Sequence, residues 1–122
     1  MAAGTVCFWA CTKLKQALGY DDSLDVFGVH GVGGAVGTLL TGVFATATLS
    51  ISADAPAGSP GLLDGNPGQV LTQLYGIAAT IGWSGLATFV LLKAIGMIVP
   101  LRVSKESEME GLDLTQHGEA LQ

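Results

Sequence analysis

The chain has 122 residues, and its composition argues against an ordinary soluble domain. Of these residues 49% are hydrophobic and only 12% are charged, about half the charged share of soluble domains. Many of the 18 glycines lie inside apolar runs, which membrane helices tolerate because small residues let backbones approach closely. A net charge of −5 does not favour a nucleic-acid partner. We therefore predict an all-α membrane protein.

Residues 1–15 are predicted to form the second part of a transmembrane helix. The apolar stretch MAAGTVCFWACT would reach ~18 Å as a helix, about half of a bilayer core. No cationic segment precedes it, so it does not fit a signal peptide. Cys7 and Cys11 lie on one face of this helix, and we interpret them as small packing residues. Two cysteines so placed indicate neither a disulfide framework nor a metal site.

A complete transmembrane helix is predicted over residues 24–49. Asp22, Ser23 and Asp25 suit its start, because carboxylates and hydroxyls accept hydrogen bonds from unpaired helix N–H groups. Residues 26–49 contain no Lys, Arg, Asp or Glu. A helix of that length extends ~36 Å, which is enough to cross a bilayer with tilt.

The rest of the chain predicts a loop, a second span and a tail. Residues 50–69 hold three of the four prolines and are expected to form a loop. Residues 70–99 are mainly apolar and carry no charge apart from Lys93, whose ammonium group we expect to reach one interface of the membrane. Residues 100–122 are polar and acidic, and we expect a tail that is partly ordered.

The basic residues predict the orientation of these spans. Lys13 and Lys15 precede the first complete span, Arg102 and Lys105 follow the second, and the intervening loop has neither Lys nor Arg. The positive-inside rule therefore places the loop outside the cell membrane and the C-terminal tail in the cytoplasm.

His30 is an ionisable side chain within an otherwise apolar span. At α-helical spacing it shares a face with Val26, Phe27, Gly33 and Gly34. Because a polar ring facing lipid would cost several kcal/mol, we expect it to face a bundle interior or a cavity. Two roles fit this position. One is a hydrogen bond that joins helices, and the other is a place in an ion or proton pathway.

Four stretches resemble the ammonium transporter (Amt/Rh) family. AAGTVCFWACTKLKQALGYDD is similar to the end of its ninth helix and the following loop, and DDSLDVFGVHGVGGAVGTLLTGVFA is similar to its tenth helix. IAATIGWSGLATFVLLKAIG resembles the eleventh helix, and LRVSKESEMEGLDLTQHGEA resembles the cytoplasmic tail. The resemblance covers nearly the whole chain, and its most specific parts are D-VFGVHGVGG and GLD-x-x-x-HGE.

The resemblance implies an eleven-helix fold, a homotrimer and one narrow apolar pore per subunit. His30 matches the second of two histidines that share a hydrogen bond across that pore, and Val26 would be an apolar pore wall. In the family, ammonium is recruited at an outer vestibule and loses a proton, and ammonia and the proton then pass by separate or coupled routes. Asp25 matches an acidic position at the cytoplasmic start of this helix, where it would either cap the helix or shape the inner pore mouth.

The resemblance also implies a regulatory role for the tail, which in the family packs under the pore and helps to dock a PII signalling protein. Gly111 would allow a sharp turn, and Asp113 and Thr115 would cap a short helix or turn. Thr115 is also a candidate phosphorylation site. We interpret His117 first as a solvated surface histidine. Trp83 and Ser84 are read as packing and interfacial groups rather than substrate ligands.

The chain would supply only two complete spans and part of a third, so we expect it to be inactive alone. Our first interpretation is that the whole chain, residues 1–122, is the C-terminal part of a longer transporter. An alternative is a small membrane interaction protein that binds PII or intact transporter subunits, and a weaker one is the remnant of a broken gene. Nothing in the sequence indicates an enzyme, a cofactor or a metal site.

Overall fold

The computed structural model describes residues 1–118, whose regular elements are all helices, with no strand. The chain divides into two units, Met1–Ile81 and Gly82–Gln122, with the boundary inside one long helix. Two helices are long and apolar enough to cross a membrane, Phe27–Phe44 and Gly68–Gly96. These are the two complete spans expected from the sequence.

The first unit begins with one continuous helical segment. It consists of α1 (Ala2–Trp9), a π-helical stretch η1 (Ala10–Leu14) and α2 (Lys15–Leu18). The segment ends at Gly19, whose φ of +61° is the left-handed conformation that commonly closes helices. The helix therefore runs three residues beyond the expected end at Lys15.

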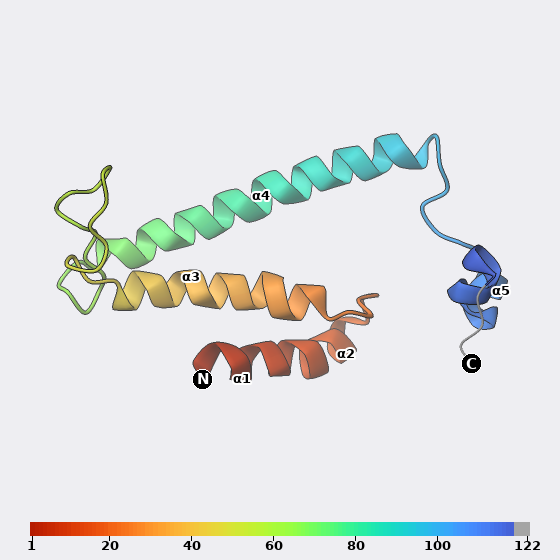
Figure 1. The fold of residues 1–122 in the computed structure, drawn as a ribbon, viewed down its shortest axis with the longest axis horizontal. Coiled ribbons are helices and arrows are strands. Elements are labelled where there is room, and N and C mark those ends of the chain that lie inside the picture. Colours follow the sequence, from red (N-terminus) through yellow and green to blue (C-terminus); the bar gives the residue numbers. More distant parts are fainter. Residues whose placement is uncertain (119–122) are drawn as a thin grey trace. The chain divides into compact units, whose positions relative to one another are not determined.

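A second continuous segment returns alongside the first, as Figure 1 shows for α1 and α3. It consists of the π-helical stretch η2 (Phe27–Val32) and α3 (Gly33–Phe44). The apolar stretch predicted a helix to Leu49, and that end is wrong. The backbone turns extended at Ala45, with φ −59° and ψ 137°.

The following loop explains why α3 stops at Phe44. Its backbone returns to the helix end, where the N–H of Leu62 donates to the carbonyl of Gly42 at 2.9 Å and that of Leu63 to Val43 at 3.1 Å. These bonds satisfy carbonyls that a helix end leaves unpaired. Gly61 permits this approach, because a Cβ there would lie 2.8 Å from the Ala45 oxygen. Sequence hydropathy carries no signal for such a contact.

Helix α4 (Gly68–Gly96) contains 29 residues, none of which is buried. The helix begins two residues before the predicted start at residue 70, and it ends three residues before the predicted end at residue 99. After Gly96 the chain makes a tight turn, in which the N–H of Val99 donates to the Ile95 carbonyl at 2.8 Å. Pro100 follows, and a residue before proline is disfavoured in the helical conformation.

The described part of the tail contains a short helix α5 (Lys105–Glu110) and a π-helical turn η3 (Asp113–His117). Ser104 caps α5, because its hydroxyl accepts a hydrogen bond from the Ser107 N–H at 3.2 Å. The expectation of a partly ordered tail extends to residue 122, and its last four residues lie outside the described part of the chain.

Candidate functional site

His30 lies in η2, where the helix has π rather than α geometry. A π turn holds more residues than an α turn, so α-helical spacing misplaces the neighbours of a residue inside it. Two residues expected on the His30 face have other close neighbours. A Cβ on Gly33 would point at the Cys7 sulfur, 2.8 Å away, and the Phe27 ring lies within 3.0 Å of a Cβ on Gly31. The face drawn around His30 from the sequence is therefore wrong in this part.

The opposite side of η2 packs tightly against the first helical segment. A Cβ on Gly28 would lie 2.5 Å from the Cys11 sulfur and 3.0 Å from the Cys11 nitrogen. The Cys7 thiol approaches the Val29 carbonyl, and the Cys11 thiol the Asp25 carbonyl, both at 3.9 Å. The two cysteines thus have the packing role that their spacing predicted.

This packing fixes the direction of the imidazole. Gly28 is buried against Cys11, whereas His30 is exposed. Two residues along a helix rotate the side-chain direction by roughly 160–200°, in either α or π geometry. His30 therefore points away from the helix that packs on Gly28. Within residues 1–118 its ring makes no hydrogen bond, and the Val26 side chain near it is 50% exposed.

The start of the His30 helix is held by two carboxylates with different tasks. Asp22 is the capping residue, because its oxygens accept from the N–H groups of Val26 at 2.9 Å and Phe27 at 2.8 Å. The Asp25 carboxylate instead pairs with the Lys15 ammonium at 2.7 Å. Of the residues expected at this helix start, Asp22 therefore forms the cap. The capping role considered for Asp25 is not found, and its role at the pore mouth stays a prediction.

Asp25 is also unusual in its backbone. Its φ of +55° lies in the left-handed region, which is strained for most residues and tolerated best by glycine, asparagine and aspartate. Lys15 donates both to the Asp25 carboxylate and to the Asp22 carbonyl. This one side chain therefore ties the end of α2 to the strained entry of the next helix.

Tyr20 completes this junction. Its ring meets the Phe27 ring edge-on, with centroids 5.5 Å apart. Its hydroxyl is buried and has no hydrogen-bond partner among the described residues. Burial raises the pKa of the Tyr20 hydroxyl, and the nearby Asp22 carboxylate raises it further.

The tail residues form a separate small cluster in the second unit. Gly111 has a φ of +99°, so the sharp turn expected there is present. The Thr115 hydroxyl donates to the Gly111 carbonyl at 3.0 Å and reaches the Ser107 carbonyl at 3.5 Å, joining η3 to the end of α5. Among the described residues no side chain caps the start of η3, so of the two residues expected to cap a helix or turn only Thr115 makes such a hydrogen bond. His117 is exposed.

An ion pair braces the same cluster. The Arg102 guanidinium donates two hydrogen bonds to the Glu108 carboxylate, at 2.7 and 3.2 Å. Arg102 lowers the pKa of Glu108. Hydrogen bonds from its own backbone N–H and from Ser104 lower the pKa of Glu106.

Sequence reasoning missed the Lys15–Asp25 pair and the π turns. The pair could have been predicted, because Gly19 lies between Lys15 and Asp25 and reverses the chain, which brings the two side chains together. The π turns had no signal in the apolar pattern. Across the described residues, no group of three or more His, Cys, Asp or Glu side chains is arranged to hold a metal ion.

Comparison with known proteins gives a consistent result. The sequence model of the Ammonium Transporter Family matches residues 1–121. An ammonium transporter of Bacillus subtilis is 45% identical over 116 residues, which is 95% of this chain and 28% of that protein. One from Aquifex aeolicus is 49% identical over 119 residues, or 97% of this chain and 26% of that protein.

An ammonium transporter of Archaeoglobus fulgidus is 38% identical over 120 residues, which is 98% of this chain. The chain thus spans about a quarter of the length of the curated relatives it matches. All three are named as transport proteins rather than enzymes. Membership of this family implies a membrane location, and the two apolar helices of the chain are consistent with it.

Proposed function

Since the chain belongs to the ammonium transporter family, we propose that it is the C-terminal part of a channel-like protein that moves ammonium or ammonia across the cell membrane. The observation that carries this proposal is the family match over residues 1–121, combined with an exposed histidine inside an apolar helix that can span a membrane.

His30 is the residue proposed to act on the substrate. Moving NH4+ through a dry apolar pore carries a large desolvation penalty, which loss of a proton avoids. A neutral imidazole has one donor and one acceptor nitrogen, so it can hydrogen-bond ammonia and hold or pass a proton. Because its ring points away from Cys11 and is unpartnered in the described chain, it is available to a pore and to a second histidine elsewhere in the protein.

Val26 and Asp25 are proposed to shape the inner end of that pathway. Val26 lies one turn before His30 and is half exposed, as an apolar pore wall requires. Asp25 fixes the entry of the helix through Lys15, which would hold the pore mouth in register with His30. In this proposal Asp25 is a positioning residue, since its carboxylate is already paired.

The matching experiment compares His30→Ala with His117→Ala in the longest protein that carries this chain. We expect His30→Ala to change the uptake of radiolabelled methylammonium at least tenfold, because an imidazole in the pathway would be lost. His117→Ala makes the same chemical change on the exposed tail, outside the pore. There a regulatory role would change uptake much less, by no more than about threefold. Unchanged uptake by a well-expressed His30→Ala protein would overturn the proposed role.

The full protein is proposed to have the eleven-helix fold and the trimeric assembly that the family resemblance implies, with the tail in the cytoplasm. Two complete spans cannot enclose a pore, so we expect the 122-residue chain alone to give no uptake. The tail residues Gly111, Asp113, Thr115 and His117 are proposed to regulate transport through contacts made by η3 and α5.

A second candidate function is a membrane protein that binds a PII signalling protein or intact transporter subunits. The exposed apolar side chains of the tail favour it, since Met109 is 81% exposed and Leu114 is 54% exposed, and such groups often mark protein contacts. A binding assay with purified PII separates the candidates. Tight binding by the chain alone, together with no effect of His30→Ala on uptake, would favour the second function.

A further inference from the structure

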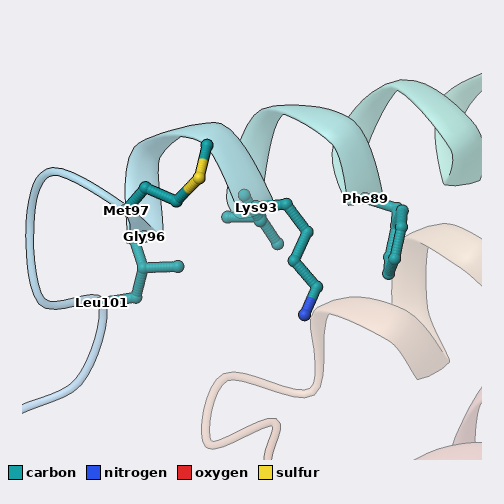
Figure 2. A pocket seen from close by; sticks show the side chains of 6 residues that line it. Phe89, Lys93, Gly96, Met97 and Leu101 are labelled. Carbon is teal, nitrogen blue, oxygen red and sulfur yellow. The ribbon is translucent and has the colours of Figure 1, made fainter.

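A groove lies at the end of α4 that the transport proposal does not use. It encloses about 530 Å³ and is lined by one basic side chain and five apolar or glycine residues: Phe89, Leu92, Lys93, Gly96, Met97 and Leu101. Figure 2 shows these side chains gathered around the last turns of the helix.

The groove exists because the chain folds back after α4. Leu101 lies over the bare backbone of Gly96, where a Cβ would come within 3.2 Å of the Leu101 Cδ1 atom. A side chain at position 96 would therefore push Leu101 away. The resulting wall is apolar on the side of Met97 and Leu101, and the Lys93 side chain extends away from them (Figure 2).

The only charge in the lining is the Lys93 ammonium group. It lies 5.7 Å from the centre of the Phe89 ring, and no carboxylate of the described residues pairs with it. Arg102, the next basic residue along the chain, is already bound to Glu108. An anion is therefore the complement of this groove, whereas a cation such as ammonium would be repelled.

The position of Lys93 along the helix specifies the kind of anion. From Gly68 to Leu92 the helix runs ~37 Å, at ~1.5 Å per residue, and this exceeds the ~30 Å hydrocarbon core of a bilayer. The backbone of Lys93 therefore lies at the edge of the hydrocarbon core, and its long side chain can extend from there to the lipid phosphates. Phe89, one turn earlier, lies where the acyl chains begin. One molecule with an anionic head and an apolar chain matches both parts.

We infer that this groove binds an anionic phospholipid, with its phosphate on the Lys93 ammonium group and the start of an acyl chain against Phe89 and Leu92. The inference depends on the membrane location of α4 and not on the identity of the transported species. It can therefore fail while the transport proposal stands, and the reverse also holds.

The test titrates the detergent-solubilised protein with phosphatidylglycerol or phosphatidylcholine and counts bound lipids by native mass spectrometry. Lys93→Met should weaken phosphatidylglycerol binding by about fivefold, the equivalent of about 1 kcal/mol for one basic residue near a lipid surface. Lys93→Arg should retain the affinity. Lys105→Met removes the same charge from α5, outside the groove, and should have no effect.

Phosphatidylcholine shares the acyl chains and the phosphate but is neutral overall, so its binding should be weaker and insensitive to Lys93→Met. Equal affinity of the wild-type protein for both lipids would overturn the inference, as would equal phosphatidylglycerol binding by Lys93→Met. Absence of a bound lipid in the groove, because another protein segment fills it, would overturn it too.

Discussion

The segment that carries His30 and the last turns of α4 are both apolar and helical, yet their surroundings differ. The first is fixed on one side by sulfur atoms over Gly28 and Gly33 and at its start by an ion pair. The second has no buried residue, and its groove holds one basic side chain that no carboxylate within residues 1–118 neutralises. Close packing fixes the direction of a side chain, whereas an open apolar face leaves room for a ligand.

The largest expected effect tests the close packing directly. Gly28→Ala would place a methyl group 2.5 Å from the Cys11 sulfur, and overpacking of this kind typically costs about 1–3 kcal/mol. Gly34→Ala on the same segment and Gly85→Ala on α4 meet nothing within 4 Å. Thermal unfolding in detergent should show a loss for the first variant and no loss for the other two. Equal stability of all three would contradict the packing described here.

A smaller effect is expected at the junction before the His30 helix. Lys15→Met removes the partner of Asp25, and the two side chains are 28% and 40% exposed, so solvent screens the pair and only a small loss of unfolding free energy is expected. A double-mutant cycle with Asp25→Asn isolates this coupling. Lys13→Met serves as the control with the same charge change. A coupling energy of zero would show that the pair does not hold the junction.

The smallest effect concerns the tail and its pH dependence. Because Arg102 lowers the pKa of Glu108, the ion pair stabilises α5 fully above the pKa of an unfolded glutamate, about 4.3. The contribution is lost as the pH falls through the lowered pKa of the folded state. Carbon chemical shifts of α5 should therefore lose helical character at pH values below about 4. The Glu108→Gln variant should not show this loss of helix on acidification. If the variant still shows it, a group other than Glu108 is responsible.

Apolar runs predicted the existence of both complete spans well, because long uncharged stretches have few alternatives to a membrane helix. Asp22 was correctly placed at a helix start. The end of α3 was wrong because Gly61, Leu62 and Leu63 compete for its last carbonyls from a distant part of the loop. The capping role went to Asp22 because Lys15 binds Asp25 across a reversed chain. The end of α3 and the capping role of Asp25 were both mispredicted because they depend on contacts between separate segments. The local sequence pattern does not encode such contacts.

The surroundings of His30 illustrate the same limit. Its place inside an apolar span was evident from sequence, but the π geometry of η2 changed which residues share its face. The thiols of Cys7 and Cys11 approach the carbonyls of Val29 and Asp25 beside this turn, and such contacts between distant segments leave no trace in the apolar pattern. For the groove at Lys93, the sequence indicated only a lysine near a helix end. It could not predict that Leu101 packs over Gly96, because this contact depends on the turn after α4.

The central claim is that His30 is one of two histidines in a pore, and that the second histidine lies elsewhere in a longer protein. The most direct measurement is to sequence the DNA upstream of the codon for Met1 and translate it in the same frame. The account predicts an open frame that encodes roughly eight further apolar spans, as inverted-repeat transporters require, with a second histidine inside one of them. In-frame stop codons directly upstream would contradict it, and the proposed pore role of His30 would fall.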